Sequence, residues 1–198
     1  MKSYKLVFFS LVFPFVFFSC EKMDDFELSQ TVFIEDPYYP GLPIYSEWGY
    51  NTFGAYIDRR PFISTHYDLP VKIIVNSDML HMNLRGVMDG QEVDLRFSVR
   101  GYSPASHYDL TGLNNTTINL KESGREVFLK LGDHNQELEL IEGELRFESV
   151  QLLYVDEDLT RTIVSGYFQF KTFLEGEPIA ISHGRFDFGI GYENFYNY

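Results

Sequence analysis

Apolar residues occupy every second position in several stretches of this chain, and this spacing most restricts what it can fold into. In residues 91–99, Val93, Leu95, Phe97 and Val99 alternate with polar or charged residues. Because successive side chains of a strand point to opposite faces, the pattern predicts an antiparallel strand with one buried face. We expect further strands within 31–34, 53–57, 61–63, 71–75, 80–84, 118–120, 127–131, 138–140, 145–154, 165–170 and 179–192.

No long segment has the 3.6-residue period of a helix, and no repeat of 20–50 residues is present. The chain therefore predicts an all-β fold, a single antiparallel β-sandwich or an open β-barrel of about ten strands. The sequence leaves the choice between those two architectures open.

The connections and irregularities between these strands are also predicted. Turns are expected at 36–43, 58–60, 142–143 and 156–158, and a loop at 101–115 with a strand fragment at 108–110. The alternation changes phase between Phe147 and Val150, and again between Ile181 and Phe186. We expect a β-bulge near Ser149 and a second one at Gly184. The last residues before Tyr198 are expected to fray.

The first twenty residues have the order of a secretory signal. Lys2 and Lys5 precede the apolar run 6–18, and the small residue Ser19 precedes Cys20. As a helix, this run would reach roughly 20 Å, short of the roughly 30 Å hydrocarbon core of a membrane. We therefore expect a signal peptide at 1–19, a polar tether at 20–30 and one β-domain at 31–198.

Charge and cysteine content narrow the function classes. Removal of 1–19 removes two lysines and no acidic residue, so the net charge changes from −13 to −15. This balance argues against binding of nucleic acid or of anionic membrane surfaces, which Lys and Arg recognise. Cys20 is the single cysteine, so disulfides within the chain, CxxC redox chemistry and thiolate zinc sites are excluded.

Three groups of residues resemble known bacterial patterns. VFFSC (16–20) is similar to the lipobox of bacterial lipoproteins, in which the chain is cut before a cysteine that is then lipidated. NTFGAYIDRRPFIS (51–64) and SGYFQF (165–170) with ISHGRFD (181–187) resemble two signatures, NTFGC-hydrophobic-VNGxxWxP and SGTFxF…ITxGRFD, of a Bacteroidota lipoprotein family with no assigned function. This chain has Ala55 and Arg59 where that pattern has cysteine and glycine. The resemblance implies an outer-membrane lipoprotein with a compact β-barrel-like sandwich, on the periplasmic or cell-surface face.

The sequence indicates no catalytic or metal site and no cofactor. The five histidines form none of the patterns HxH, HxxH and HExxH, and no GxSxG or SxxK motif supplies an activated serine. Arg185 and Asp187 lie two residues apart on one expected strand, where an exposed cross-strand ion pair would contribute at most about 1 kcal/mol. We therefore expect a protein that is not an enzyme.

An aromatic run is the best candidate for recognition of a glycan or a protein. It consists of Tyr38, Tyr39, Tyr45, Trp48 and Tyr50. Aromatic rings on loops stack on sugars or anchor protein partners. The alternative is that these rings cap the end of the barrel as part of its core.

These observations favour a lipid-anchored, non-catalytic binding module of the cell envelope. A periplasmic immunity or inhibitor lipoprotein is the alternative, because the negative charge suits a basic secreted toxin. An uncharacterised envelope enzyme is the third hypothesis.

The lipidation hypothesis predicts the mass of the mature N-terminus. Mass spectrometry of the native protein should show a chain that begins at Cys20 and carries acyl groups. An unmodified cysteine or an uncut leader would contradict both the anchor and the location inferred from it.

Overall fold

The computed structural model of the chain describes residues 31–64, 69–132 and 134–198, and these residues are mostly β-strand. The expected leader, Cys20 and the tether lie outside this range. The described elements are β1 (Thr52–Ile57), β2 (Arg60–Ile63), β3 (Val71–Asn76), β4 (Met79–Met88), β5 (Gln91–Arg100), the 3₁₀ helix η1 (His107–Leu113), β6 (Thr116–Asn119), β7 (Arg125–Leu131), β8 (His134–Glu137), β9 (Leu140–Val155), β10 (Asp158–Leu174), β11 (Glu177–Ile190) and β12 (Phe195–Asn197).

The twelve described strands form one open sheet. Its order is β6–β9–β10–β11–β1–β2–β4–β5–β7–β8, with β3 joined to β4 and β12 joined to β3. All described pairings are antiparallel except that of β12 with β3. The all-β, antiparallel fold class is confirmed.

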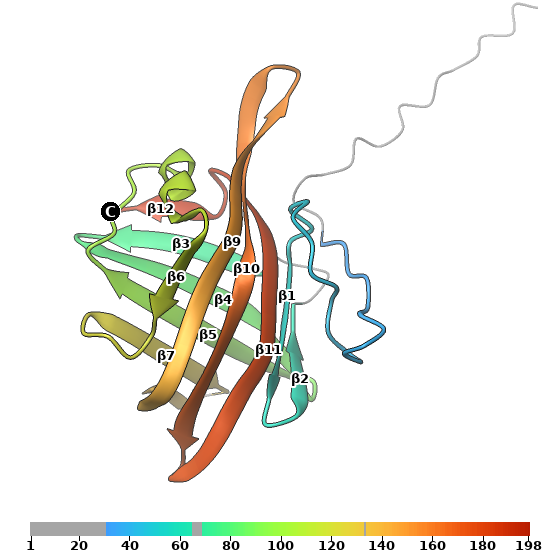
Figure 1. The fold of residues 1–198 in the computed structure, drawn as a ribbon, viewed down its shortest axis with the longest axis vertical. Helices are drawn as coiled ribbons and strands as arrows, with labels where there is room; N and C mark the ends of the chain where they lie inside the picture. The colour runs from blue at the N-terminus through green and yellow to red at the C-terminus, as the bar shows by residue number, and fades with distance from the viewer. Residues whose placement is uncertain (1–30, 65–68, 133) are drawn as a thin grey trace, which may run out of the picture.

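The sheet bends back on itself so that its two halves enclose one core. β2 and β4 are joined through the single pair Ile63↔Val87, and β9–β11 cross in front of β3–β5 and β7 (Figure 1). Phe97 of β5 contacts Phe168 and Phe170 of β10, with ring centroids 5.3 and 6.1 Å apart. The two halves therefore pack face to face, as in a sandwich built from one sheet.

The predicted alternation matches the buried faces. Val93, Leu95, Phe97 and Val99 of β5 are all buried, as are Leu80, Met82 and Leu84 of β4. The core is rich in phenylalanine, and its largest fully buried side chains include Phe53, Phe62, Phe97, Phe147, Phe168, Phe186 and Phe188.

Both predicted bulges are present. In β9, Glu148 lies between the pairs Ser149↔Ser165 and Phe147↔Gly166. In β11, the register against β10 shifts between Gly184 and Ile181, and His183 has a φ of 54°. A Cβ on Gly184 would lie 2.3 Å from the carbonyl oxygen of Phe168, so only glycine allows this close approach.

The turn predicted at 142–143 is wrong. Both residues lie inside β9, where Gly143 faces Phe170 of β10. A Cβ on Gly143 would lie 2.5 Å from the Cβ of Phe170, so this glycine permits two strands to approach closely. Turn glycines and close-approach glycines look alike in a sequence, which explains the error.

The longer turn expected at 58–60 is also wrong. Ile57 pairs with Arg60, which leaves a two-residue turn of Asp58 (φ 46°) and Arg59 (φ 71°). Two positive φ values define a type I′ turn, whose twist matches that of the flanking strands. The strand pairing therefore imposes on Arg59 a conformation that glycine adopts more easily. The turn predicted at 156–158 lies between β9 and β10 but is also shorter than predicted, because Val155 pairs with Asp158 and leaves a two-residue turn of Asp156 and Glu157.

Three short strands predicted from sequence, at 31–34, 108–110 and 138–140, are absent, and of the last only Leu140 lies in a strand, as the first residue of β9. Residues 31–34 are extended, with the Val32 N–H donating to the Tyr50 carbonyl (2.8 Å), but they form no strand. Residues 108–110 belong to η1, which Asp109 caps by accepting hydrogen bonds from the backbone N–H and hydroxyl of Ser106, both at 2.9 Å. This local capping favours a helical turn over a strand.

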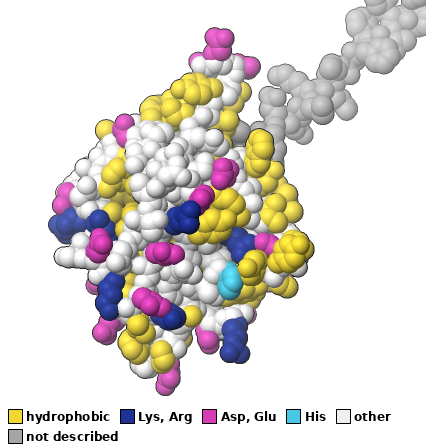
Figure 2. All heavy atoms as spheres, in the orientation of Figure 1, with side chains coloured by type: hydrophobic (Ala, Val, Ile, Leu, Met, Phe, Trp, Pro, Cys, Tyr) yellow, Lys and Arg dark blue, Asp and Glu magenta, His cyan; other side chains and the backbone are white. Residues whose placement is uncertain are grey.

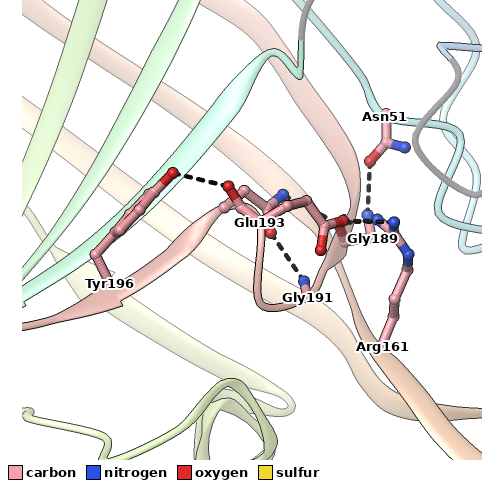
Figure 3. A network of polar contacts seen from close by, with 7 residues as sticks. Asn51, Arg161, Gly189, Gly191, Glu193 and Tyr196 are labelled. Atoms are coloured by element: carbon pink, nitrogen blue, oxygen red, sulfur yellow. Dashed lines mark hydrogen bonds and ion pairs between the residues drawn. The ribbon is translucent and has the colours of Figure 1, made fainter.

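The C-terminal segment does not fray as predicted. Phe195–Asn197 forms β12 beside β3, and the Tyr198 N–H donates to the Val75 carbonyl (3.0 Å). Figure 3 shows the polar network that holds the turn at 191–194, which precedes β12. Glu193 forms an ion pair with Arg161, and the Tyr196 hydroxyl donates to the Glu193 carbonyl (2.8 Å).

No helix in the described ranges is long and apolar enough to cross a membrane.

The β1–β2 turn makes a prediction about stability. Arg59→Gly should raise the free energy of unfolding by about 1 kcal/mol, because glycine adopts the left-handed conformation without the Cβ penalty. For a domain of this size, Tm should rise by about 2–4 °C. Arg60→Gly, one residue later in the strand, is the matched control and should lower Tm. Thermal unfolding in which Arg59→Gly lowers Tm as well would contradict the turn assignment.

Candidate functional site: an aromatic and polar face on β9–β11

A buried carboxylate fixes the segment that leads into β1. Asp187 of β11 is 1% exposed. Five groups donate hydrogen bonds to it: the hydroxyls of Ser46 and Ser165, and the backbone N–H groups of Trp48 (3.2 Å), Gly49 (2.8 Å) and Tyr50 (3.1 Å). A buried carboxylate needs such donors to replace water. The loop at 46–50 is therefore wrapped around one side chain of the sheet.

Arg185 binds the same N-terminal region at a second point. It is 6% exposed and forms an ion pair with Asp36 (2.5 Å), and its guanidinium lies 4.6 Å from the ring centroid of Tyr39. The cross-strand ion-pair lattice considered for Arg185 and Asp187 is therefore not formed, since the partner of Arg185 is Asp36 and Asp187 accepts from residues 46–50. Both side chains turn to residues 36–50, which cover that part of the strand face, and both are buried.

Five side chains form what we call the aromatic shelf: Tyr39, Tyr45, Tyr56, Tyr167 and His183. Tyr45 stacks on Tyr167 of β10, with centroids 4.5 Å apart. Tyr39 and Tyr56 contact the His183 ring, at centroid distances of 4.6 and 5.9 Å. Figure 2 shows hydrophobic side chains gathered on the side of the molecule where the N-terminal segment lies against these strands. The bulge at His183 turns its side chain outward into this group.

The hydroxyls of Tyr45 and Tyr167 remain protonated near neutral pH. Burial raises the pKa of Tyr45, and the hydrogen bond that its hydroxyl donates to Glu47 (2.8 Å) raises it further. Burial is also the main cause that raises the pKa of Tyr167. Tyr45 and Tyr167 therefore present neutral rings with polar hydroxyl edges.

The structure separates the five aromatic residues that the sequence singled out. Tyr39 and Tyr45 belong to the shelf, and Tyr50 is half-buried beside the Asp187 cage. Tyr38 and Trp48 are the most exposed, at 86% and 75%. None of the five lies in the buried core.

A polar groove of about 690 Å³ adjoins the shelf on the outer face of β6, β9, β10 and β11. Gln169 of the groove lies two residues from Tyr167 on β10, and Ser182 precedes His183 on β11, so the groove and the shelf are neighbours along these two strands. The lining side chains that can form hydrogen bonds are Thr117, Asn119, Glu122, Glu142, Glu144, Gln169, Lys171 and Ser182.

The groove carries an excess of acceptors. Lys171 pairs with Glu142 (2.7 Å), and the Gln169 amide donates to Glu144 (2.8 Å). The hydrogen bond from Lys171 lowers the pKa of Glu142, so this carboxylate is ionised near neutral pH. With three carboxylates and one ammonium group on its walls, the groove favours neutral or cationic ligands over anionic ones.

The groove and three members of the shelf, Tyr56, Tyr167 and His183, were not identified from sequence. The alternation of Tyr167, Gln169 and Lys171 with the buried Phe168 and Phe170 marks an outward face. However, the neighbours of that face come from segments far away in the chain, which no local pattern reveals. Among the residues described, no group of three or more His, Cys, Asp or Glu side chains is placed to hold a metal ion.

Comparisons with protein-family models, curated proteins and solved structures found no match to this chain.

The Asp187 cage predicts a large effect from one substitution. Asp187→Asn should lower the free energy of unfolding by about 3 kcal/mol, because the amide removes the charge and points an N–H₂ group at other donors. The matched control is Asp89→Asn, whose exposed pair with Arg60 (3.4 Å) should contribute less than about 1 kcal/mol. Chemical denaturation measures both. Equal effects would mean that the cage does not stabilise the fold.

Proposed function

We propose that this chain is a lipid-anchored, non-catalytic glycan-binding protein of the bacterial outer membrane, of the Bacteroidota lipoprotein type that its two signatures resemble. The observation that carries the proposal is the placement of the aromatic shelf beside the polar groove along β10 and β11. Sugar rings offer apolar C–H faces to aromatic side chains, and their hydroxyls donate to carboxylates and amide oxygens.

The dimensions of the face agree with this ligand class. The groove volume of about 690 Å³ lies within the roughly 300–1,000 Å³ typical of small-ligand sites. The shelf is already assembled, because Tyr45 and Tyr39 are held by contacts within the protein. A preformed site loses little conformational entropy on binding.

The charge of the groove restricts the glycan. Uronic-acid or sulfated polysaccharides would meet Glu122, Glu142 and Glu144, so anionic glycans are disfavoured. We therefore propose a neutral or amino-sugar glycan whose ring stacks at Tyr167 and whose hydroxyls extend over Gln169 and Glu144.

Affinity electrophoresis in gels that contain neutral polysaccharides tests the proposal. Tyr167→Ala should raise the Kd for the retarding glycan about tenfold, which corresponds to the roughly 1.4 kcal/mol that a stacked ring supplies. Tyr198→Ala removes a ring that is 80% exposed outside the site and is the matched control. Unchanged retardation of Tyr167→Ala, or binding to no glycan tested, would overturn the proposal.

A second pair of variants tests the exposed loop. The double variant Trp48→Ala/Tyr50→Ala should weaken binding of the same glycan, because the loop at 46–50 directly follows Tyr45 of the shelf. Protease shaving of whole cells separates this proposal from the inhibitor alternative, since a surface glycan binder is lost and a periplasmic inhibitor survives.

A further inference from the structure

The β9–β10 hairpin extends beyond the body of the molecule. Its end, residues 151–161, is called the arm below and projects past the rest of the sheet (Figure 1). The arm is anchored at its base, where the Gln151 amide donates to the Glu47 carbonyl (3.0 Å) and Arg161 pairs with Glu193. These contacts fix the direction in which the arm points.

The arm carries apolar side chains on both of its faces. Tyr154 and Val155 are 57% and 44% exposed. Because Tyr154 pairs with Leu159, these two side chains lie on one face together with Leu152, whereas Leu153 and Val155 lie on the other. Leu152, Leu153 and Leu159 are only partly buried. An apolar surface of this kind on a projecting ribbon is typical of an interaction site.

The tip of the arm is acidic. Asp156 (φ 52°) and Glu157 (φ 71°) form the turn, and Asp158 follows; all three are exposed. Asn-Gly would form the same turn with less strain, but here the turn presents carboxylates. Figure 2 shows hydrophobic side chains along this projection and acidic ones at its end.

We infer that the arm is a docking element for another protein, one that offers an apolar groove bordered by Lys and Arg. The apolar faces of the arm would fill the groove, and the three carboxylates of the tip would meet the basic border. This surface is separate from the shelf and groove, so the inference does not depend on glycan binding.

The negative charge of the arm and of the whole chain disfavours two other partners, a membrane surface and a second copy of this chain. A membrane surface that contains anionic lipids repels the tip, and insertion would bury three carboxylates without partners. A second copy of this chain has the same excess of acidic residues, 29 Asp and Glu against 16 Lys and Arg, so it would repel the acidic tip. A basic protein surface is the occupant that the arm fits.

Site-specific photo-crosslinking in the cells that make the protein tests the inference. p-Benzoylphenylalanine at position 154 should give a discrete adduct with one protein, which mass spectrometry identifies. The same residue at position 198, on the exposed Tyr198 at the C-terminus, is the control and should not give that adduct.

The identified partner is then purified and its Kd for the full chain measured. Tyr154→Ser should raise this Kd at least tenfold. D156N/E157Q/D158N should also raise it and reduce its dependence on salt. Neither variant should change glycan retardation, which separates this inference from the proposed function. An adduct only with lipid, only with a second copy, or equally at position 198 would overturn the inference, as would a purified partner that binds Tyr154→Ser normally.

Discussion

The carboxylate of Asp187 is the interaction on which the arrangement of the candidate site depends. A charge that is 1% exposed requires hydrogen-bond donors in place of water, and most of its donors come from the loop at 46–50. Ser165 of β10 adds a donor from the neighbouring strand. One side chain therefore joins two adjacent strands and the segment that precedes β1.

The shelf follows from this attachment. Once residues 46–50 are fixed at Asp187 and Asp36 is fixed at Arg185, the chain between them must lie against the outer face of β10 and β11. Tyr39 and Tyr45 belong to that connecting stretch, and they meet His183 and Tyr167 there. The bulge at His183 completes the group, because the extra residue directs a side chain outward at a point where regular alternation would not.

Much of the strand pattern could be predicted from sequence, because burial on one face of a strand leaves a period of two. The same reasoning located both bulges, since an extra residue shifts the parity of the apolar positions on either side of it. The parity of the apolar positions does not distinguish a glycine in a turn from a glycine that allows two strands to approach closely, so Gly143 was assigned to a turn. It also does not reveal which outer faces are covered. The burial of Arg185 and Asp187 could not be predicted, because the segment that covers them lies about 140 residues earlier. Three members of the shelf were missed for the same reason, because Tyr56, Tyr167 and His183 form a recognisable group only together with Tyr39 and Tyr45 of another segment.

The pairing of β1 with β11 bears on when the protein can fold. β1, at residues 52–57, pairs with residues 181–187 of β11, and β3 pairs with β12 at residues 195–197. Closing such distant contacts costs chain entropy, and pairings of this kind slow folding. Neither junction can form until almost the whole chain has been synthesised. The growing chain therefore lacks its β1–β11 pair through most of its synthesis, and the sheet can be completed only after the C-terminal strands have been made.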